Sequence, residues 1–304
     1  MAGDNPYFRQ VRLLLRLLPL IAREECFALK GGTAINLFVR DFPRLSVDID
    51  LVYLPDGERA EALAAITAAL ERMAEDISKT LSGVRLTKRF TSRNDALGLI
   101  VELDGVGVKI ELSPVLRGTV YPVQPRAVVK AVEEEFGFAE VPVVAFEDLY
   151  AGKICAALDR QHPRDLFDVR LLLDNEGLTP SLKKALLVYL ISHPRPVEEL
   201  LAPRFKPLEA GYTGEFAGMT REGVSLAELE ATRTRLVETI MCSLSHNDKV
   251  LLCSIYEGAP DWSLVELERA SDLPAVRWKL LNIARMADTK RVAALKKLRQ
   301  TLGI

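Results

Sequence analysis

The feature that most constrains this chain is a glycine pair followed along the sequence by two aspartates spaced two residues apart. Lys30-Gly31-Gly32-Thr33 is followed by Ser46-Val47-Asp48-Ile49-Asp50, with Ser46 thirteen residues after Thr33. A glycine pair at the start of a helix exposes backbone N–H groups that can bind phosphate. Two aspartates at i and i+2 of a strand point to the same face, where they can hold a divalent metal ion. The pattern therefore predicts phosphate and metal side by side, which indicates nucleotide chemistry.

The bulk composition indicates a globular protein with more than one lobe. The chain has 304 residues, 49% of them hydrophobic and 27% charged, and a formal net charge of −2. A chain of this length favours two domains, and a near-neutral charge gives no global argument for nucleic-acid binding. The four cysteines lie far apart without a C-x-x-C pair. We therefore expect reduced thiols in a cytoplasmic protein, and neither a zinc site nor a disulfide framework.

The apolar run over residues 11–21 contains two arginines and a proline. It is too short and too charged for a membrane span, and it lacks a small-residue cleavage site. We expect an amphipathic helix with a possible kink at Pro19, and no association with a membrane.

The first half of the chain predicts a lobe of mixed α and β structure. The hydrophobic periodicity predicts helices over 6–25, 33–40 and 58–77, and strands over 26–29, 46–54 and 141–145. Asp104-Gly105 between the apolar runs 97–103 and 106–112 predicts a β-hairpin, because this dipeptide favours a tight turn. On the second arm of this hairpin Lys109 and Glu111 share one face.

The second half of the chain is predicted to be mainly helical. The expected helices cover 147–158, 164–173, 182–191, 226–241 and much of 276–302. Residues 193–223 contain four prolines and four glycines, which predicts an extended connection on the surface. The fold class is therefore α/β (α+β): a lobe over 1–145 with a small mixed sheet flanked by helices, and a helical lobe over 146–304.

Three carboxylates are candidate metal ligands: Asp48 and Asp50 on one strand, and Glu111 on the neighbouring hairpin. Nucleotidyl transfer uses one metal ion to activate the attacking hydroxyl and a second to bind the triphosphate, roughly 3.5–4 Å apart, and about three carboxylates can seat both. An isolated D-x-D can also mark an exposed strand edge. The glycine pair upstream argues against that alternative.

The glycine pair has a simpler alternative, because Gly31 and Gly32 could form a mere turn between a strand and a helix. We favour a phosphate site, since the following helix would begin at the same sheet edge as the aspartates, and Thr33 could add a hydroxyl. Other phosphate motifs are excluded. The sequence contains no G-x-x-x-x-G-K-[ST], and Gly105-Val106-Gly107 lacks the third glycine of a dinucleotide fingerprint.

Four further positions enter the search for site residues. Lys153 lies in a largely apolar helix, where a cation directed at a triphosphate would explain it. Arg164 and Asp168, at i and i+4, can form an ordinary ion pair on a helix surface. Ser46 shares the strand face of Asp48, so its hydroxyl could bind a triphosphate oxygen, and phosphorylation there should silence the site by adding about −1.5 to −2 charges. An ordinary strand serine is equally compatible with the sequence.

The end of the chain is basic. Residues 277–304 carry eight basic side chains against one acidic residue, Asp288. Such a density suits contacts to the phosphates of a nucleic acid. A solvated helix face, or cations that complement a helix dipole at its C-terminus, would explain it equally well.

Together these motifs resemble the AbiEii/MenT-type nucleotidyltransferases, toxins of type IV toxin-antitoxin and abortive-infection systems in the polymerase-β-like superfamily. The resemblance covers roughly residues 20–175, with weaker similarity near Trp262 and Trp278. It is carried by Gly31-Gly32-Thr33, Arg44-x-Ser46-x-Asp48-x-Asp50-Leu51, Lys109-Ile110-Glu111, Glu147-Asp148-Leu149-x-x-x-Lys153 and Arg164-Asp165-x-x-Asp168.

The resemblance implies a metal-dependent enzyme that transfers NMP from an NTP to an RNA acceptor, with the tRNA 3′ end as the leading acceptor. It implies that Asp48 and Asp50 ligate Mg²⁺, that Lys153 binds the triphosphate and that Asp168 completes the active centre. Glu111 fits the third carboxylate of the superfamily less firmly. A cognate antitoxin protein is the implied partner.

Two alternatives remain at this stage. The same fold could modify a protein hydroxyl, as in AMPylation, or a small molecule, and the basic end of the chain favours RNA only weakly. The second alternative is a non-catalytic interaction module on the same scaffold. The intact Asp48, Asp50 and Lys153 argue against that loss of activity.

Overall fold

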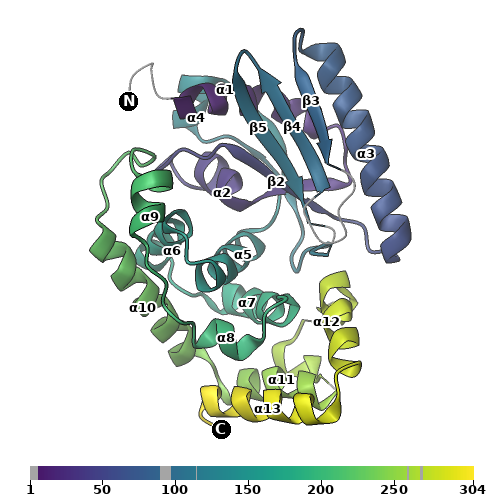
Figure 1. Ribbon diagram of the computed structural model, residues 1–304, viewed down its shortest axis with the longest axis vertical. Helices are drawn as coiled ribbons and strands as arrows, with labels where there is room; N and C mark the ends of the chain where they lie inside the picture. Colours follow the sequence, from purple (N-terminus) through teal and green to yellow (C-terminus); the bar gives the residue numbers. More distant parts are fainter. Residues whose placement is uncertain (1–5, 90–96, 114, 259, 268–269) are drawn as a thin grey trace. The chain divides into compact units, whose positions relative to one another are not determined.

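The computed structural model describes residues 6–89, 97–113, 115–258, 260–267 and 270–304. The chain divides into two compact units (Figure 1). The first unit comprises Met1–Ala145 together with Gly218–Gly223, and the second comprises Phe146–Ala217 together with Val224–Ile304. A short segment from late in the sequence is therefore part of the first unit.

The first unit is built on a mixed β-sheet, as the sequence predicted. Within the described residues it has seven strands in the order β3-β4-β5-β2-β1-β7-β6. The strands are β1 (Phe27–Lys30), β2 (Asp48–Tyr53), β3 (Arg85–Arg89), β4 (Leu97–Leu103), β5 (Val106–Leu112), β6 (Gln124–Ala127) and β7 (Glu140–Val143). The predicted hairpin is confirmed, because β4 and β5 pair antiparallel across Asp104-Gly105, where both residues have the positive φ of a tight turn.

The two outermost strands, β3 and β6, were not predicted. β3 has the sequence RLTKR, which lacks apolar alternation, and β6 contains Pro125. Both features are tolerated at a sheet edge, where one side of the strand needs no backbone partner. Edge strands therefore escape a search for hydrophobic periodicity.

The helices of the first unit pack on the sheet, and one of them starts at the glycine pair of the candidate site. They are α1 (Pro6–Ile21), α2 (Gly31–Ala34), α3 (Arg59–Thr80) and α4 (Lys130–Phe136). Helix α1 packs on β5 and β7, and α3 packs on β3 and β4, with buried leucines and isoleucines between them. Helix α1 ends before the predicted residue 25. The helix predicted over 33–40 begins instead at Gly31, and it widens into a π-helical turn over Ile35–Val39.

The second unit is helical, as predicted. Its helices are α5 (Phe146–Asp159), α6 (Pro163–Asn175), α7 (Pro180–Ser192), α8 (Val197–Leu201), α9 (Glu209–Gly211), α10 (Leu226–Ser243), α11 (His246–Glu257), α12 (Pro274–Ala284) and α13 (Asp288–Leu302). Helix α5 packs against both α6 and α7, while α12 packs on α7 and α13 packs on α8 and α11. Among the described residues, no helix is long and apolar enough to cross a membrane.

Two expectations for the second unit need correction. Residues 193–223 are not extended throughout, because they contain α8, α9 and a π-helical turn over Tyr212–Phe216, with Leu200 and Phe216 buried. The prolines there flank the short helices instead of preventing them, since Pro196 is the N-cap of α8 and Pro203 follows its last turn. The helix expected over much of 276–302 is interrupted at Arg285–Ala287, so it forms α12 and α13 as separate elements.

Candidate functional site

The glycine pair lies where β1 ends and α2 begins, directly against the carboxylate of Asp50. Gly31 has a φ of +75°, in the left-handed region that favours glycine. A Cβ atom on Gly31 would lie 2.9 Å from Cγ of Asp50, closer than real Cβ atoms come. Position 31 therefore requires glycine for two reasons: its backbone conformation and the close approach of the Asp50 carboxylate.

Strand β2 presents both aspartates to one face of the sheet. Asp48 and Asp50 are half-buried, whereas Ile49 and Leu51 between and after them are buried on the opposite face. In the sheet register Asp50 lies beside Lys30 of β1 on one side and beside Glu111 of β5 on the other. The structure thus brings the three predicted carboxylates to neighbouring positions of two strands.

Glu111 differs from the two aspartates in its surroundings. Its carboxylate lies 3.7 Å from the guanidinium of Arg89 on β3. If Glu111 were the third carboxylate at the metal, metal binding would have to compete with this exposed ion pair.

The turn where β1 ends and α2 begins, at Gly31 and Gly32, is called the glycine corner. The chain segment that leads into β2 packs against this corner. A Cβ atom on Gly32 would lie 2.8 Å from Nη2 of Arg44 and 3.0 Å from Oγ of Ser46. The hydroxyl of Thr33 donates to the carbonyl oxygen of Asp48 at 2.5 Å and lies 3.1 Å from the Ser46 hydroxyl. Thr33 is fully buried, so its hydroxyl, which we expected at a phosphate, is engaged in holding Asp48 in place.

The segment Gly218–Gly223 supports the same lead-in from its other side. The amide of Leu45 donates to the carbonyl of Met219 at 2.8 Å, and the amide of Arg221 donates to the carbonyl of Pro43 at 2.9 Å. The Arg221 guanidinium also lies over the Phe42 ring, 4.7 Å from its centroid. Through these contacts the backbone that precedes β2 is paired with the segment Gly218–Gly223.

The donor set at this corner fits a hard divalent cation. Carboxylate oxygens are the ligands that Mg²⁺ prefers, and it is usually held by one or two carboxylates, with substrate phosphates and water filling its other positions. Asp48 and Asp50 supply two such carboxylates on one face. Within the described part of the chain, no three His, Cys, Asp or Glu side chains form a ready-made metal cluster. A nucleotide would therefore have to supply the remaining ligands.

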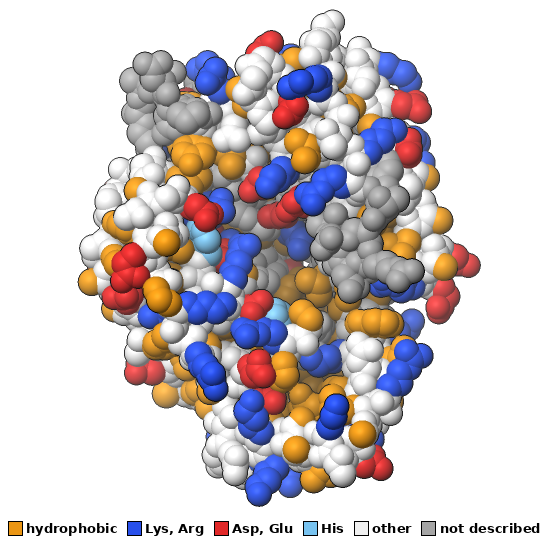
Figure 2. All heavy atoms as spheres, viewed as in Figure 1, with side chains coloured by type: hydrophobic (Ala, Val, Ile, Leu, Met, Phe, Trp, Pro, Cys, Tyr) orange, Lys and Arg blue, Asp and Glu red, His pale blue; other side chains and the backbone are white. Residues whose placement is uncertain are grey.

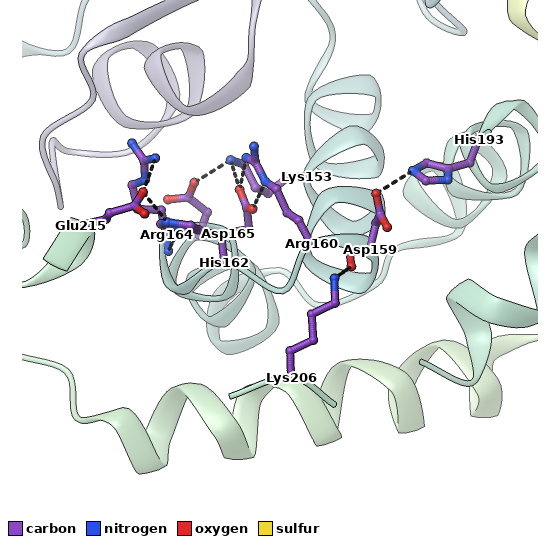
Figure 3. A network of polar contacts seen from close by, with 10 residues as sticks. Lys153, Asp159, Arg160, His162, Arg164, Asp165, His193, Lys206 and Glu215 are labelled. Atoms are coloured by element: carbon purple, nitrogen blue, oxygen red, sulfur yellow. Dashed lines mark hydrogen bonds and ion pairs between the residues drawn. The ribbon is translucent and has the colours of Figure 1, made fainter. Parts of the chain in front are cut away.

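In the second unit, Lys153 lies between two buried aspartates of the next helix. Its ammonium on α5 is 2.9 Å from Oδ1 of Asp165 and 3.1 Å from Oδ2 of Asp168, both on α6 (Figure 3). Lys153 is 6% exposed and the two aspartates are fully buried. Arg160, in the turn between the helices, binds the Asp165 carboxylate through two N–H groups, at 2.5 and 2.9 Å.

Two positive charges therefore balance two negative charges in this cluster. Burial alone would raise the pKa of Asp165, because it disfavours the charged form. The charge of Lys153 and the hydrogen bonds from Arg160 and Lys153 outweigh burial, and they hold the pKa of Asp165 well below its usual range. The Asp165 carboxylate is therefore ionised and fixes the position of the Lys153 ammonium.

The helix-surface ion pair considered for Arg164 and Asp168 is wrong for Asp168, which is fully buried and faces Lys153. The guanidinium of Arg164 instead lies 3.7 Å from the carboxylate of Glu215. His162 caps α6, since its Nδ1 accepts a hydrogen bond from the amide of Arg164, and its Nε2 lies 3.1 Å from Glu215. Burial and the nearby Arg164 lower the pKa of His162, so its ring is neutral at pH 7 and donates from Nε2.

Sequence reasoning missed Gln161, which lies next to Arg160 in the turn between α5 and α6. Gln161 is buried with a φ of +55°, and its side chain donates to the carbonyl of Arg204 at 2.8 Å. The same side chain accepts from the amide of Lys206 at 3.0 Å and from Arg233 at 3.1 Å. The motif Arg164-Asp165-x-x-Asp168 drew attention to Asp165 but gave it no role, and a single buried glutamine leaves no pattern in a sequence.

A mixed sheet that sets a glycine corner against strand carboxylates, in a chain with a helical second unit, is the architecture of a nucleotidyltransferase. The family model described as "Nucleotidyl transferase AbiEii toxin, Type IV TA system" matches residues 12–280. The chain belongs to this family of nucleotidyltransferase toxins, as its motifs predicted. Membership makes the protein a nucleotidyltransferase and implies an NTP substrate and an antitoxin partner.

A solved structure with the same fold is MenT4, a nucleotidyltransferase toxin from Mycobacterium tuberculosis H37Rv. The two chains superpose with a TM-score of 0.61 at 17% sequence identity, over 91% of this chain and 93% of MenT4. At this identity the similarity shows the fold, which is the one predicted. No curated protein matches the chain.

Proposed function

We propose that this protein is a metal-dependent toxin that transfers NMP from an NTP to RNA, with the 3′ end of tRNA as its preferred acceptor. The observation that carries the proposal is the contact between the Gly31 backbone and the carboxylate of Asp50. In the reaction the acceptor hydroxyl attacks the α-phosphate of the NTP, a phosphodiester bond forms and pyrophosphate leaves.

The first unit would bind the triphosphate and the metal ion. Gly31 and Gly32 lie at the start of α2, and their backbone N–H groups would donate hydrogen bonds to phosphate oxygens. Asp48 and Asp50 would hold Mg²⁺, which when bound lowers the pKa of the attacking hydroxyl and neutralises charge on the leaving pyrophosphate. Thr33 and Ser46 would keep Asp48 in register with the corner. Glu111 is the candidate third carboxylate.

The second unit would contribute a positioned cation. A lysine ammonium has three N–H donors, and that of Lys153 directs two of them at Asp165 and Asp168. The third donor would bind a triphosphate oxygen. Because the aspartates fix the ammonium in advance, little side-chain freedom would be lost when the nucleotide binds.

The acceptor is assigned to RNA because of the basic residues after position 276, where eight cations accompany one acidic residue. Phosphates of a nucleic acid suit such a density better than a neutral small molecule does.

The test is a labelling reaction. Purified protein is incubated with each α-³²P-labelled NTP, Mg²⁺ and a mixture of total RNA and total protein. We expect label at the 3′ end of RNA with one or a few NTPs, and none with Asp48→Asn or Lys153→Met. Label on a protein band would move the assignment to AMPylation. No label with any NTP, when the cognate antitoxin is absent, would contradict the proposed reaction.

A further inference from the structure

The last two helices of the chain differ in charge from everything before them. Residues 277–304 carry eight basic and one acidic side chain, a net charge of +7, whereas the remainder of the chain carries −9, since the whole has −2. The positive charge is therefore concentrated on α12, α13 and the turn between them.

The eight cations fall into three groups according to their hydrogen-bond and ion-pair partners. Lys279 is structural, because its ammonium donates to the carbonyls of His193 and Arg195 at 2.7 and 3.0 Å and so attaches α12 to the end of α7. Four others lie within 4.0 Å of an acidic group, in the pairs Arg277–Asp272, Arg291–Asp288, Lys297–Glu199 and Arg299–Glu257. The three that remain, Arg285, Lys290 and Lys296, are exposed, and no acidic side chain among the described residues pairs with them.

The helix dipole accounts for Arg285, which is the C-cap of α12, but not for Lys290. Lys290 and Arg291 lie in the first turn of α13, which starts at Asp288, and that end of a helix disfavours positive charge. The last turn of α13, where cations are favourable, contains only Arg299. The placement of Lys290 therefore costs helix stability and needs another reason.

An exposed aromatic side chain shares a helix face with one of these cations, Arg285. On α12, Trp278 is 40% exposed and Leu281 is 41% exposed. Trp278, Leu281 and Arg285 follow the spacing i, i+3, i+7, which places them on one face of the helix. Apolar and basic side chains lie side by side over this region in Figure 2.

We propose that the face of α12 formed by Trp278, Leu281 and Arg285, with Lys290 and Lys296 on the helix that follows it, docks the acceptor RNA. This inference rests on the proposed RNA acceptor. Bases of a single-stranded 3′ end would stack on Trp278, and the three unpaired cations would contact backbone phosphates, the combination by which proteins hold single strands without reading their sequence. RNA is the occupant here because it is the acceptor of the proposed function; an acidic protein could use both the cations and the indole, so its binding is an outcome of the test.

The first experiment measures binding without catalysis. Fluorescence anisotropy with labelled tRNA, in EDTA and without NTP, compares the full chain with the variant Arg285→Gln/Lys290→Gln/Lys296→Gln. We expect about tenfold weaker binding near 0.15 M salt, and a salt dependence reduced by roughly 2 to 3 in slope, because each phosphate contact contributes about 0.7–0.9.

A matched control removes three exposed cations from the first unit, with Arg12→Gln/Lys79→Gln/Lys130→Gln. It changes the net charge by the same amount, so a specific docking surface predicts near-normal tRNA binding. Equal weakening by both triple variants would overturn the proposal in favour of a general charge effect. So would normal tRNA binding by the first variant together with loss of antitoxin binding.

The second experiment tests stacking on Trp278. The chain has two tryptophans, so Trp262→Phe leaves Trp278 as the only indole reporter. We expect tRNA to quench its fluorescence, Trp278→Ala to weaken tRNA binding several-fold, and Trp278→Phe to restore most of the affinity, since a phenyl ring also stacks. Absence of quenching in a complex that still forms would contradict the stacking role.

The two proposals fail in different ways. If no RNA is labelled by wild-type protein in the transfer assay, the proposed reaction is wrong whatever the anisotropy shows. If RNA is labelled and the Arg285/Lys290/Lys296 variant binds and modifies tRNA as the control does, only the docking surface is wrong.

Discussion

The two units use acidic residues in opposite ways. In the first unit Asp50 is half-buried, and no cationic side chain among the described residues pairs with it. In the second unit Asp165 and Asp168 are fully buried and are neutralised by Lys153 and Arg160. The difference teaches that the charge of Asp50 would be available to a metal ion under the proposed function, whereas Asp165 and Asp168 use their charge to fix a cation of the protein itself.

The largest expected effect is on transfer by Asp50→Asn. The amide keeps the shape of the carboxylate but loses the charge that would hold Mg²⁺, so nucleotide transfer should fall roughly a hundredfold to a thousandfold, in the range seen when a stabiliser of transition-state charge is removed. Because Asp50 is half-buried, the melting temperature should change little. Steady-state transfer and thermal melts provide the two measurements.

Glu111→Gln is the companion to that variant, since Glu111 lies beside Asp50 in the register but pairs with Arg89. A loss as large as that of Asp50→Asn would make Glu111 a metal ligand, and a small loss would leave it an ion-pairing residue. Full transfer by Asp50→Asn would remove the basis of the comparison between the two units.

The next effect is on stability, with Asp165→Asn. This change leaves the buried Lys153 and the Arg160 guanidinium without their shared carboxylate, and breaking a buried ion pair in this way costs about 3–5 kcal/mol. Urea unfolding should show the loss, with an unchanged slope. A free energy of unfolding within about 1 kcal/mol of wild type would mean that the cluster is hydrated and not a fixed support.

The third prediction separates backbone strain from contact at the glycine corner. Gly31 and Gly83 have φ values of +75° and +77°, but only Gly31 has a side chain against it, that of Asp50. Gly83→Ala should lose about 1–2 kcal/mol of stability from the left-handed conformation and keep full transfer activity. Gly31→Ala should lose more stability and most of the transfer, because the methyl group displaces Asp50. Equal behaviour of the two variants would show that the contact does not matter.

The smallest effect is in acid. The folded state holds the pKa of Asp165 below its ordinary value, so this residue adds stability that is complete above about pH 4 and is lost as the pH falls further. Between about pH 5 and 2.5, Asp165→Asn should therefore lose about 1–2 kcal/mol less stability than wild type does. Chemical unfolding at several pH values measures this difference. Parallel losses in both proteins would contradict the lowered pKa.

Local patterns predicted much of the first unit and of the corner. The Asp104-Gly105 turn, the alternation on β5 and the amphipathic spacing in α3 each depend on residues close in sequence, so their physical cause is visible there. The same holds for Asp48 and Asp50, whose shared face follows from strand geometry alone.

The features that escaped prediction depend on distant partners. The environment of Lys153 is set by Asp165 and Asp168 on another helix, and i, i+4 spacing suggested a different pair for Asp168. The burial of the Thr33 hydroxyl depends on its contact with Asp48 across the corner, which no short-range pattern encodes. The roles of the charged and hydroxyl side chains therefore depend on the three-dimensional structure, whereas the faces of the strands follow from the sequence alone.

The pairing of Gly218–Gly223 with the lead-in to β2 has a consequence for how the protein is made. A ribosome that has released only the first 145 residues has supplied every strand that the structure describes in the sheet, yet it has not supplied the segment that braces the backbone before Asp48. The nascent chain thus completes the support of Asp48 and of the proposed nucleotide site only after much of the helical half has emerged. A fragment cut at residue 145 would lack that brace for the same reason.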